Sequence, residues 1–249
     1  MPRQKQTIRR SRAEDLRQIR SWLRKEDAEG VQGGFLVNWP EIERAHREGN
    51  LLVFVDDSGS PIAFQLGGLL RPGILQVRNH DRGRGIGRRL VEHCVHSALK
   101  RDECLLFIEC KPSTSIPFWK KMGFTLVPEG VKNYACRVLE KLLPLPSEGQ
   151  CARVEIRFFP EAKMWDGTAR SYASHHPVAR RLPDGTVKFE KRVLFHEKLE
   201  AGVGDVVVEV QLDGKRLYLD KAKYDEAKLL GVHRCTNGWY MDELVSGLQ

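Results

Sequence analysis

The sequence has no uninterrupted apolar run near the ~18 residues that a helix needs to cross a bilayer. Its opening stretch, MPRQKQTIRRSRAEDL, is charged and lacks the apolar central region of a secretory signal. Charged residues make up 30% of the 249 residues, and the mean hydropathy is −0.43. These features predict a cytoplasmic protein that does not enter membranes.

The spacings of common zinc sites are also missing. The cysteines include no C-x-x-C pair and the histidines show no H-x-x-x-H spacing, so we expect no metal. Several cysteines fall inside apolar periodic segments, where a reduced core thiol is the ordinary role. The six cysteines are Cys94, Cys104, Cys110, Cys136, Cys151 and Cys235.

The positive charge of the chain is confined to its first part. The formal net charge is +8, and residues 1–145 hold 25 Lys and Arg against 17 Asp and Glu, whereas the rest is neutral. A basic surface attracts anions, such as a phosphorylated cofactor, an acidic protein or nucleic acid. The excess is mild beside the basic stripes of dedicated nucleic-acid binders, so it permits a nucleic-acid partner without requiring one.

A linker-like segment coincides with this change in charge. LLPLPSEGQ at 142–150 holds two prolines followed by Ser-Glu-Gly, which neither a helix interior nor a central strand accommodates. We therefore predict one domain over residues 1–145 and a smaller, mainly β domain over residues 146–249. Asp-Gly turn signals at 184–185 and 213–214 support hairpins there. The sequence leaves open whether this second domain recognises substrate, binds a partner or forms a homodimer.

Strand and helix patterns alternate through the first domain. Apolar spacing predicts helices over 13–26, 39–49, 85–102 and 115–123. Between them we predict strands at 7–10, a hairpin over 51–70, and strands at 73–77, 104–110, 124–127 and 134–141. This order predicts an α/β fold, in which a mixed sheet is flanked by helices.

The stretch RGRGIG at 82–87 joins a predicted strand to a predicted helix. Unpaired N–H groups and the positive end of the helix dipole gather at such a turn, and glycines let an anion approach closely. Two phosphate-binding patterns are excluded here. The third glycine of G-x-G-x-x-G is replaced by Arg88, and no G-x-x-x-x-G-K-[ST] string occurs. Compensating charge comes from Arg82, Arg84, Arg88 and Arg89.

The turn does fit R-x-x-G-x-G, with Arg82, Gly85 and Gly87. It resembles the pyrophosphate-binding signature of GNAT-type N-acetyltransferases, and the resemblance extends from about residue 7 to 141. In that family the signature follows a strand ending in a valine-like residue, here Val77, and opens a long amphipathic helix. A strand and a short helix ending in Gly-Phe come next, here LLFIEC and FWKKMGF. No family is identified for residues 150–249.

The resemblance implies acetyl-CoA as cosubstrate and gives each residue of the turn a role. The Val77 backbone would hydrogen-bond the pantetheine arm, which lies like an added strand against LQV. The strands LQV and LLFIEC would splay apart and admit the acyl thioester. The implied cofactor-binding residues are Val77, Arg82, Gly83, Arg84, Gly85, Ile86, Gly87 and Arg88.

One position departs from the family pattern. Many members place a tyrosine four residues before the glycine of the short helix, where it protonates the leaving thiolate; this sequence has Trp119. Because an indole N–H is not a usable acid, another group or water could supply the proton, the thiolate could leave as an anion, or the domain could bind without turnover. We expect Trp119 to be a packing or acceptor-pocket aromatic.

Two residues near the end of LLFIEC are candidates for proton transfer. Glu109 is the first candidate for the general base, and a structural carboxylate paired with an arginine is the alternative. Cys110 could act as an acid or be an inert core thiol.

Two functions are compatible with this pattern. One is an N-acetyltransferase that transfers an acetyl group from acetyl-CoA to an amine by direct attack, the acceptor being a small molecule, a protein amine or an aminoacyl group on RNA. The other is a non-catalytic acyl-CoA-binding sensor whose β domain is an interaction module.

Overall fold

The computed structural model describes residues 7–70, 73–127, 133–161, 170–171, 173–196, 205–236 and 238–245. The chain divides into two compact units. The first unit contains Met1–Arg101 and Leu106–Arg137, and the second contains Asp102–Leu105 and Val138–Gln249. None of the described helices is long and apolar enough to cross a membrane.

This division differs from the predicted ranges at residues 102–105 and 138–145, which group with the second unit. The reason lies in long-range bonds that the local pattern does not show. The Thr236 hydroxyl donates to Glu103 at 2.7 Å, and the Leu143 N–H donates to the Glu190 carbonyl at 2.8 Å. The domain boundary at residue 146 itself stays a prediction.

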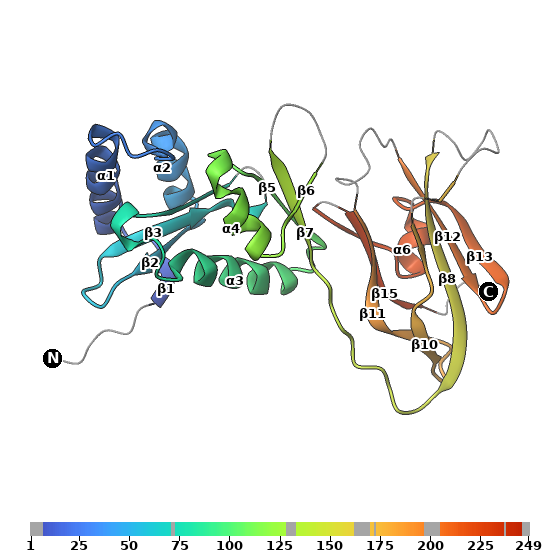
Figure 1. Cartoon of the computed structure of the whole chain (residues 1–249). Coiled ribbons are helices and arrows are strands. Elements are labelled where there is room, and N and C mark those ends of the chain that lie inside the picture. Colours follow the sequence, from blue (N-terminus) through green and yellow to red (C-terminus); the bar gives the residue numbers. More distant parts are fainter. Residues whose placement is uncertain are drawn as a thin grey trace. The chain divides into compact units, whose positions relative to one another are not determined.

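The first unit is built from strands and helices in the predicted order (Figure 1). Its helices are α1 (Ala13–Ala28), α2 (Trp39–Arg47), α3 (Ile86–Leu99) and α4 (Ile116–Lys121). Its strands are β1 (Thr7–Arg10), β2 (Leu51–Val55), β3 (Pro61–Leu66), β4 (Ile74–Val77), β5 (Leu105–Glu109), β6 (Thr125–Leu126) and β7 (Tyr134–Val138). Single turns of 3-10 helix form η1 (Leu36–Asn38), η2 (Gly67–Leu69), η3 (Asn79–Asp81) and η4 (Ser113–Ser115).

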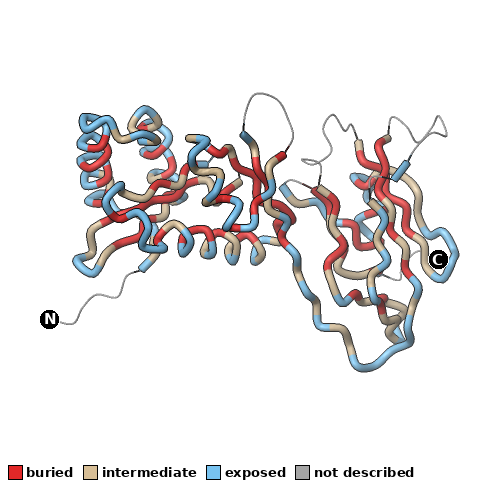
Figure 2. Tube along the Cα trace, viewed as in Figure 1, coloured by how far each residue is buried: buried red, intermediate tan, exposed pale blue. Residues whose placement is uncertain are grey.

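Helices cover both faces of the four-stranded sheet β1-β2-β3-β4 (Figure 1). Side chains alternate along β2, so that Val53 packs against α1 and α2 while Phe54 packs toward α3. Fully buried residues from the two helix layers include Ile19, Ile42 and Leu90. Figure 2 shows this pattern as buried strands between helices whose outer faces are exposed. The mixed α/β fold predicted from the sequence is therefore confirmed.

Strands β4 and β5 belong to different sheets. β4 is the last strand of the first sheet, whereas β5 begins a three-stranded sheet of order β5-β7-β6. Leu70 and Phe107 form an isolated parallel bridge between the two regions. The strands containing LQV (β4) and LLFIEC (β5) are therefore separated, as predicted.

The second unit is mainly β, as predicted. Its strands are β8 (Gln150–Pro160), β9 (Ala173–His175), β10 (Val178–Arg181), β11 (Val187–His196), β12 (Val206–Leu212), β13 (Lys215–Lys221), β14 (His233–Cys235) and β15 (Gly238–Leu244). They form an antiparallel sheet of order β13-β12-β8-β10-β11-β15-β14, with β9 beside β8. The short helix α6 (Asp225–Leu229) follows β13, in which Lys221 still pairs with Val207.

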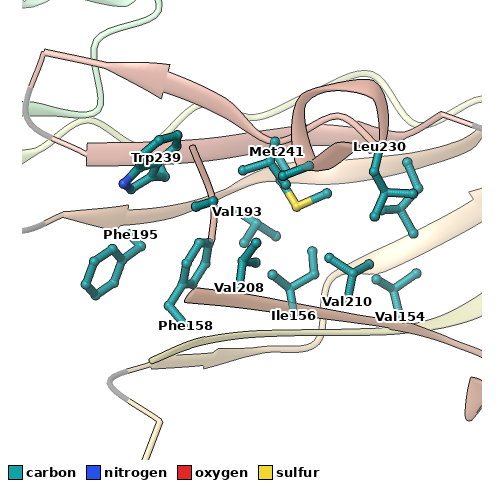
Figure 3. Close-up of a cluster of buried hydrophobic side chains, with 14 of the residues drawn as sticks. Val154, Ile156, Phe158, Val193, Phe195, Val208, Val210, Leu230, Trp239 and Met241 are labelled. Carbon is teal, nitrogen blue, oxygen red and sulfur yellow. The ribbon is translucent and has the colours of Figure 1, made fainter. Parts of the chain in front are cut away.

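The core of the second unit lies between its strands and α6 (Figure 3). Phe158 stacks on Phe195 with ring centroids 5.1 Å apart, and Trp239 and Met241 are buried with them. Trp239 is only 6% exposed, which places it in this core.

Candidate active site

A cavity of about 1290 Å³ lies within the first unit. One wall is the turn between β4 and α3, and another is the end of β5 with α4. The third wall is formed by the segment between α1 and α2 together with one face of α2. Of the residues predicted from the sequence, the cavity is lined by Val77, Arg82, Gly83, Gly85, Ile86, Gly87, Arg88, Glu109 and Trp119.

The Val77 backbone faces the open edge of β4. Arg78 donates its backbone N–H to the Ile62 carbonyl of β3 at 2.9 Å. Neighbouring residues of a strand turn their N–H groups to opposite edges, so the Val77 N–H points away from β3. The Val77 carbonyl accepts a hydrogen bond from Arg82 Nε at 3.2 Å. An extended ligand can therefore pair with this N–H as an added strand.

The glycines at 83 and 85 have a conformation that other residues rarely adopt. Both have φ of +79°, and a Cβ built at either position would meet nothing within 4 Å. Helix α3 starts directly after Gly85, and its first intrahelical bond runs from the Arg89 N–H to the Gly85 carbonyl at 3.1 Å. The preceding N–H groups lack helical partners, so the turn offers donors beside open space, as an anion requires.

A buried carboxylate supports the turn from behind. Asp81 is 3% exposed and accepts hydrogen bonds from Arg78 Nε at 2.7 Å and from Arg84 Nη1 at 2.6 Å. Charge-assisted bonds of this kind are stronger than neutral ones. The Arg84 side chain, predicted to add compensating charge at the turn, is thus held by Asp81 and does not line the cavity. Its guanidinium therefore supports the turn by its hydrogen bond to Asp81.

Gly87 differs from Gly83 and Gly85, because it is packed against neighbouring side chains instead of facing open space. A Cβ there would lie 3.2 Å from Phe118 Cζ and 3.7 Å from Val77 Cγ2. The absent side chain lets the first turn of α3 pack directly on α4. Arg89 is likewise turned to the protein, with its guanidinium 4.6 Å from the centre of the Phe54 ring.

Trp119 belongs to an aromatic cluster at the wall of the cavity. Its ring lies edge-on to Phe118 at 5.0 Å and to Phe124 at 5.2 Å, and the residue is 8% exposed. Such edge-to-face packing fixes the indole in place. The arrangement is the one expected for a packing aromatic that also borders the site.

Glu109 lies at the end of β5, half-buried and facing the cavity. Within the described part of the chain its carboxylate has no hydrogen-bond or ion-pair partner. The alternative prediction was that Glu109 is a structural carboxylate paired with an arginine. No such arginine is found among these residues. The neighbouring Cys110 is 2% exposed and does not line the cavity; burial raises the pKa of its thiol to about 11, so it stays protonated.

Residues 22–126 match the family model described as the acetyltransferase (GNAT) domain. The first unit is a GNAT domain. A search of the curated proteins found no match.

The chain was also compared with solved structures. It is similar to an N-acetyltransferase from Staphylococcus aureus Mu50, with 18% identity, 55% of this chain and 99% of that chain covered, and a TM-score of 0.42. A GNAT family N-acetyltransferase from Escherichia coli in complex with CoA has 18% identity, coverage of 56% and 84%, and a TM-score of 0.41. A putative acetyltransferase from Salmonella typhimurium with its cofactor acetyl-CoA has 16% identity, coverage of 58% and 100%, and a TM-score of 0.43.

The third wall of the GNAT domain cavity was not predicted from the sequence. It includes Gln32, Gly33, Gly34, Phe35 and Val37 of the α1–α2 segment, and Asn38, Glu41, Arg44, Ala45 and Glu48 of α2 and the two residues that flank it. The spacing of the α2 residues, three or four apart, places them on one helix face and was the available signal. For the preceding segment no such signal exists, because its position depends on distant residues. A Cβ on Gly33 would lie only 2.9 Å from Pro112 Cδ.

Proposed function

We propose that the GNAT domain transfers an acetyl group from acetyl-CoA to an amine. The observation that carries the proposal is the cavity that joins the Gly83–Gly87 turn and the free edge of β4 to Glu109. The pyrophosphate would lie against the amides of the turn and the pantetheine arm against Val77. The family match of residues 22–126 supports the same activity.

Acetyl-CoA supplies the acyl group as a thioester, and the residues of the cavity supply the remaining chemistry. Glu109, a carboxylate facing the cavity, accepts the proton that the acceptor amine loses. The amine nitrogen forms its bond to the acetyl carbon, and the carbon–sulfur bond breaks. Because Trp119 has no acidic proton to donate, the thiolate leaves as an anion and takes its proton from water.

A matched pair of glycine variants tests cofactor binding. Gly85→Ala strains a left-handed turn and places a methyl group in the proposed pyrophosphate site, while Gly214→Ala imposes the same strain (φ +81°) in a hairpin of the second unit, also in open space. By calorimetry we expect G85A to weaken CoA binding at least about tenfold, or about 1.4 kcal/mol, and G214A to leave it unchanged. Equal affinity of wild type and G85A would contradict the proposed site.

Trp119 gives a second candidate function specific support, because it stands where the family commonly has an acid. In this alternative the domain binds acyl-CoA and reports its presence without turnover. Incubation with acetyl-CoA and a panel of amines separates the two, since only transfer releases a free thiol that depends on the amine. Micromolar CoA binding without any such release would favour the sensor.

A further inference from the structure

A buried pair of side chains, Glu26 and Gln76, connects three segments of the GNAT domain. Glu26 of α1 is 5% exposed and accepts hydrogen bonds from Gln76 Nε2 at 3.1 Å and from the Asn79 backbone N–H at 2.5 Å. Gln76 of β4 is 3% exposed, and its Oε1 accepts the backbone N–H of Phe35 at 3.0 Å. Residues up to 53 positions apart in the sequence therefore meet at these two side chains.

The chemistry of the pair allows only one arrangement. An ionised carboxylate can only accept, so Gln76 must turn its NH₂ group toward Glu26. That orientation leaves the amide oxygen for the Phe35 N–H, which can only donate. Among the described residues Glu26 has no cationic partner, and N–H donors alone hold its charge. Buried polar groups linked in this way are costly to disturb, because any mismatch leaves a group unsatisfied.

The pair connects the two sides of the proposed reaction. Phe35 and the residues around it form the third wall of the cavity, where an acceptor would enter. Gln76 lies one residue before Val77, and Asn79 begins η3, which leads to Asp81 and the glycine turn. The same wall also approaches the segment before α4 closely, since a Cβ on Gly33 would lie 2.9 Å from Pro112 Cδ. The position of the acceptor wall relative to the thioester thus depends on Glu26 and Gln76.

We propose that Glu26 and Gln76 are positioning residues that hold residues 32–37 in the geometry that binds the acceptor amine. The inference rests on the proposed acetyl transfer. Glu26 does not line the cavity, whereas Gln76 does, with its amide hydrogen-bonded to Glu26 and to the Phe35 N–H. Their loss therefore raises the KM for the acceptor more than it lowers kcat.

An exchange of the two groups provides the test. In E26Q two NH₂ groups face each other, and in Q76E two carboxylates do, so each single variant loses the bond between positions 26 and 76 that links Glu26 to the Phe35 segment. In E26Q/Q76E the new amide at position 26 accepts from Asn79 and donates to the new carboxylate at position 76, which also accepts from Phe35. All three hydrogen bonds are restored, and only the bond between positions 26 and 76 reverses its direction. The control is E29Q, an equal charge change at an exposed site near the end of α1.

Two measurements are made on the full chain. Hydrogen exchange of peptides covering residues 30–38 is expected to be at least about tenfold faster in each single variant and to return within about twofold of wild type in the double variant. With the amine that wild type acetylates fastest, the single variants raise the acceptor KM about tenfold and the double variant restores it.

The outcomes separate this inference from the proposed function. Normal exchange and normal acceptor KM in E26Q and Q76E would overturn the inference, as would a folded double variant that restores neither. A wild-type protein that acetylates no amine would contradict the proposed activity instead. Exchange of residues 30–38 would then still decide whether the pair holds the wall.

Discussion

The Asp81 carboxylate lies 2.6 Å from Arg84 Nη1 and 2.7 Å from Arg78 Nε, so that two cations converge on one buried anion behind the glycine turn. Asp81 is 3% exposed, whereas the Arg84 side chain is 57% exposed. The buried Asp81 carboxylate is therefore the fixed centre of this network, and the exposed Arg84 side chain is held by it. The arrangement explains how a turn with two left-handed glycines keeps one conformation.

We predict that Asp81→Asn weakens CoA binding. The substitution keeps the size of the side chain but removes the charge that orients Arg78 and Arg84, so the turn loses its support. The expected loss is about tenfold in affinity, corresponding to one charge-assisted bond of about 1.5 kcal/mol. Calorimetric titration with CoA measures it, and Asp57→Asn, in the exposed β2–β3 turn, is the control. Unchanged CoA affinity in a folded D81N protein would contradict a supporting role.

Glu109→Gln is expected to reduce kcat without affecting cofactor affinity. The amide cannot take a proton from the acceptor, and general-base assistance is worth about 10² to 10⁴ in rate. Steady-state kinetics with the preferred amine give kcat, and calorimetry gives the CoA affinity. Glu92→Gln on the exposed face of α3 removes a charge elsewhere in the unit. A kcat within about threefold of wild type in E109Q would show that Glu109 is not the base.

Trp119→Phe is expected to leave turnover within about threefold, because the indole donates no proton and Phe118 and Phe124 can pack against a phenyl ring. Thermal unfolding should show only a modest loss from the smaller ring. A fall in kcat of about a hundredfold with normal CoA affinity would instead assign the indole N–H a part in the reaction.

The stability of the first unit should fall in acid through Asp15. Burial opposes ionisation of this carboxyl, but hydrogen bonds from the Arg9 guanidinium and the Arg12 backbone outweigh it, so the pKa of Asp15 lies below its ordinary value. A group whose pKa is lowered by folding stabilises the fold above its unfolded pKa of about 3.9, and this contribution disappears as pH falls through the folded value.

Urea unfolding of wild type and Asp15→Asn between pH 7 and pH 3 measures this contribution. At neutral pH we expect D15N to lower the free energy of unfolding by about 1–3 kcal/mol, since Arg9 loses its buried partner. Below about pH 4 the difference should shrink as Asp15 is protonated in the wild type. Glu14→Gln, exposed and adjacent, should change little at any pH. A difference that is independent of pH would exclude the ion pair as its cause.

The features predicted from the sequence are those encoded over short distances. The R-x-x-G-x-G turn, the strand ending at Val77 and the helix after it are consecutive, and each reveals itself by glycine position or apolar spacing. The nearly continuous apolar run before Glu109 similarly identifies a buried strand, although β5 lies at the end of its sheet and not at a central position. These local patterns were sufficient to locate two walls of the cavity.

What the sequence did not reveal depends on contacts between distant residues. Residues 29–38 have no apolar period, and their position is set by Gln76 and Pro112. The charge of Arg84 suggested phosphate binding, yet a carboxylate three residues earlier holds it, a spacing that could have been noticed. For Gly87 the need for a small residue comes from Phe118, which lies 31 positions later, and no local pattern indicates it.

The central claim is that the cavity of the GNAT domain carries acetyl transfer. Its most direct test is release of free thiol from acetyl-CoA, followed with a panel of amines for wild type, G85A and G214A. We predict that wild type and G214A release thiol only when an amine is present. Mass spectrometry should find acetylated amine in an amount equal to the released thiol. G85A should release much less thiol at the same acetyl-CoA concentration. Thiol release that is independent of the amine, or equal in G85A and wild type, would contradict the account.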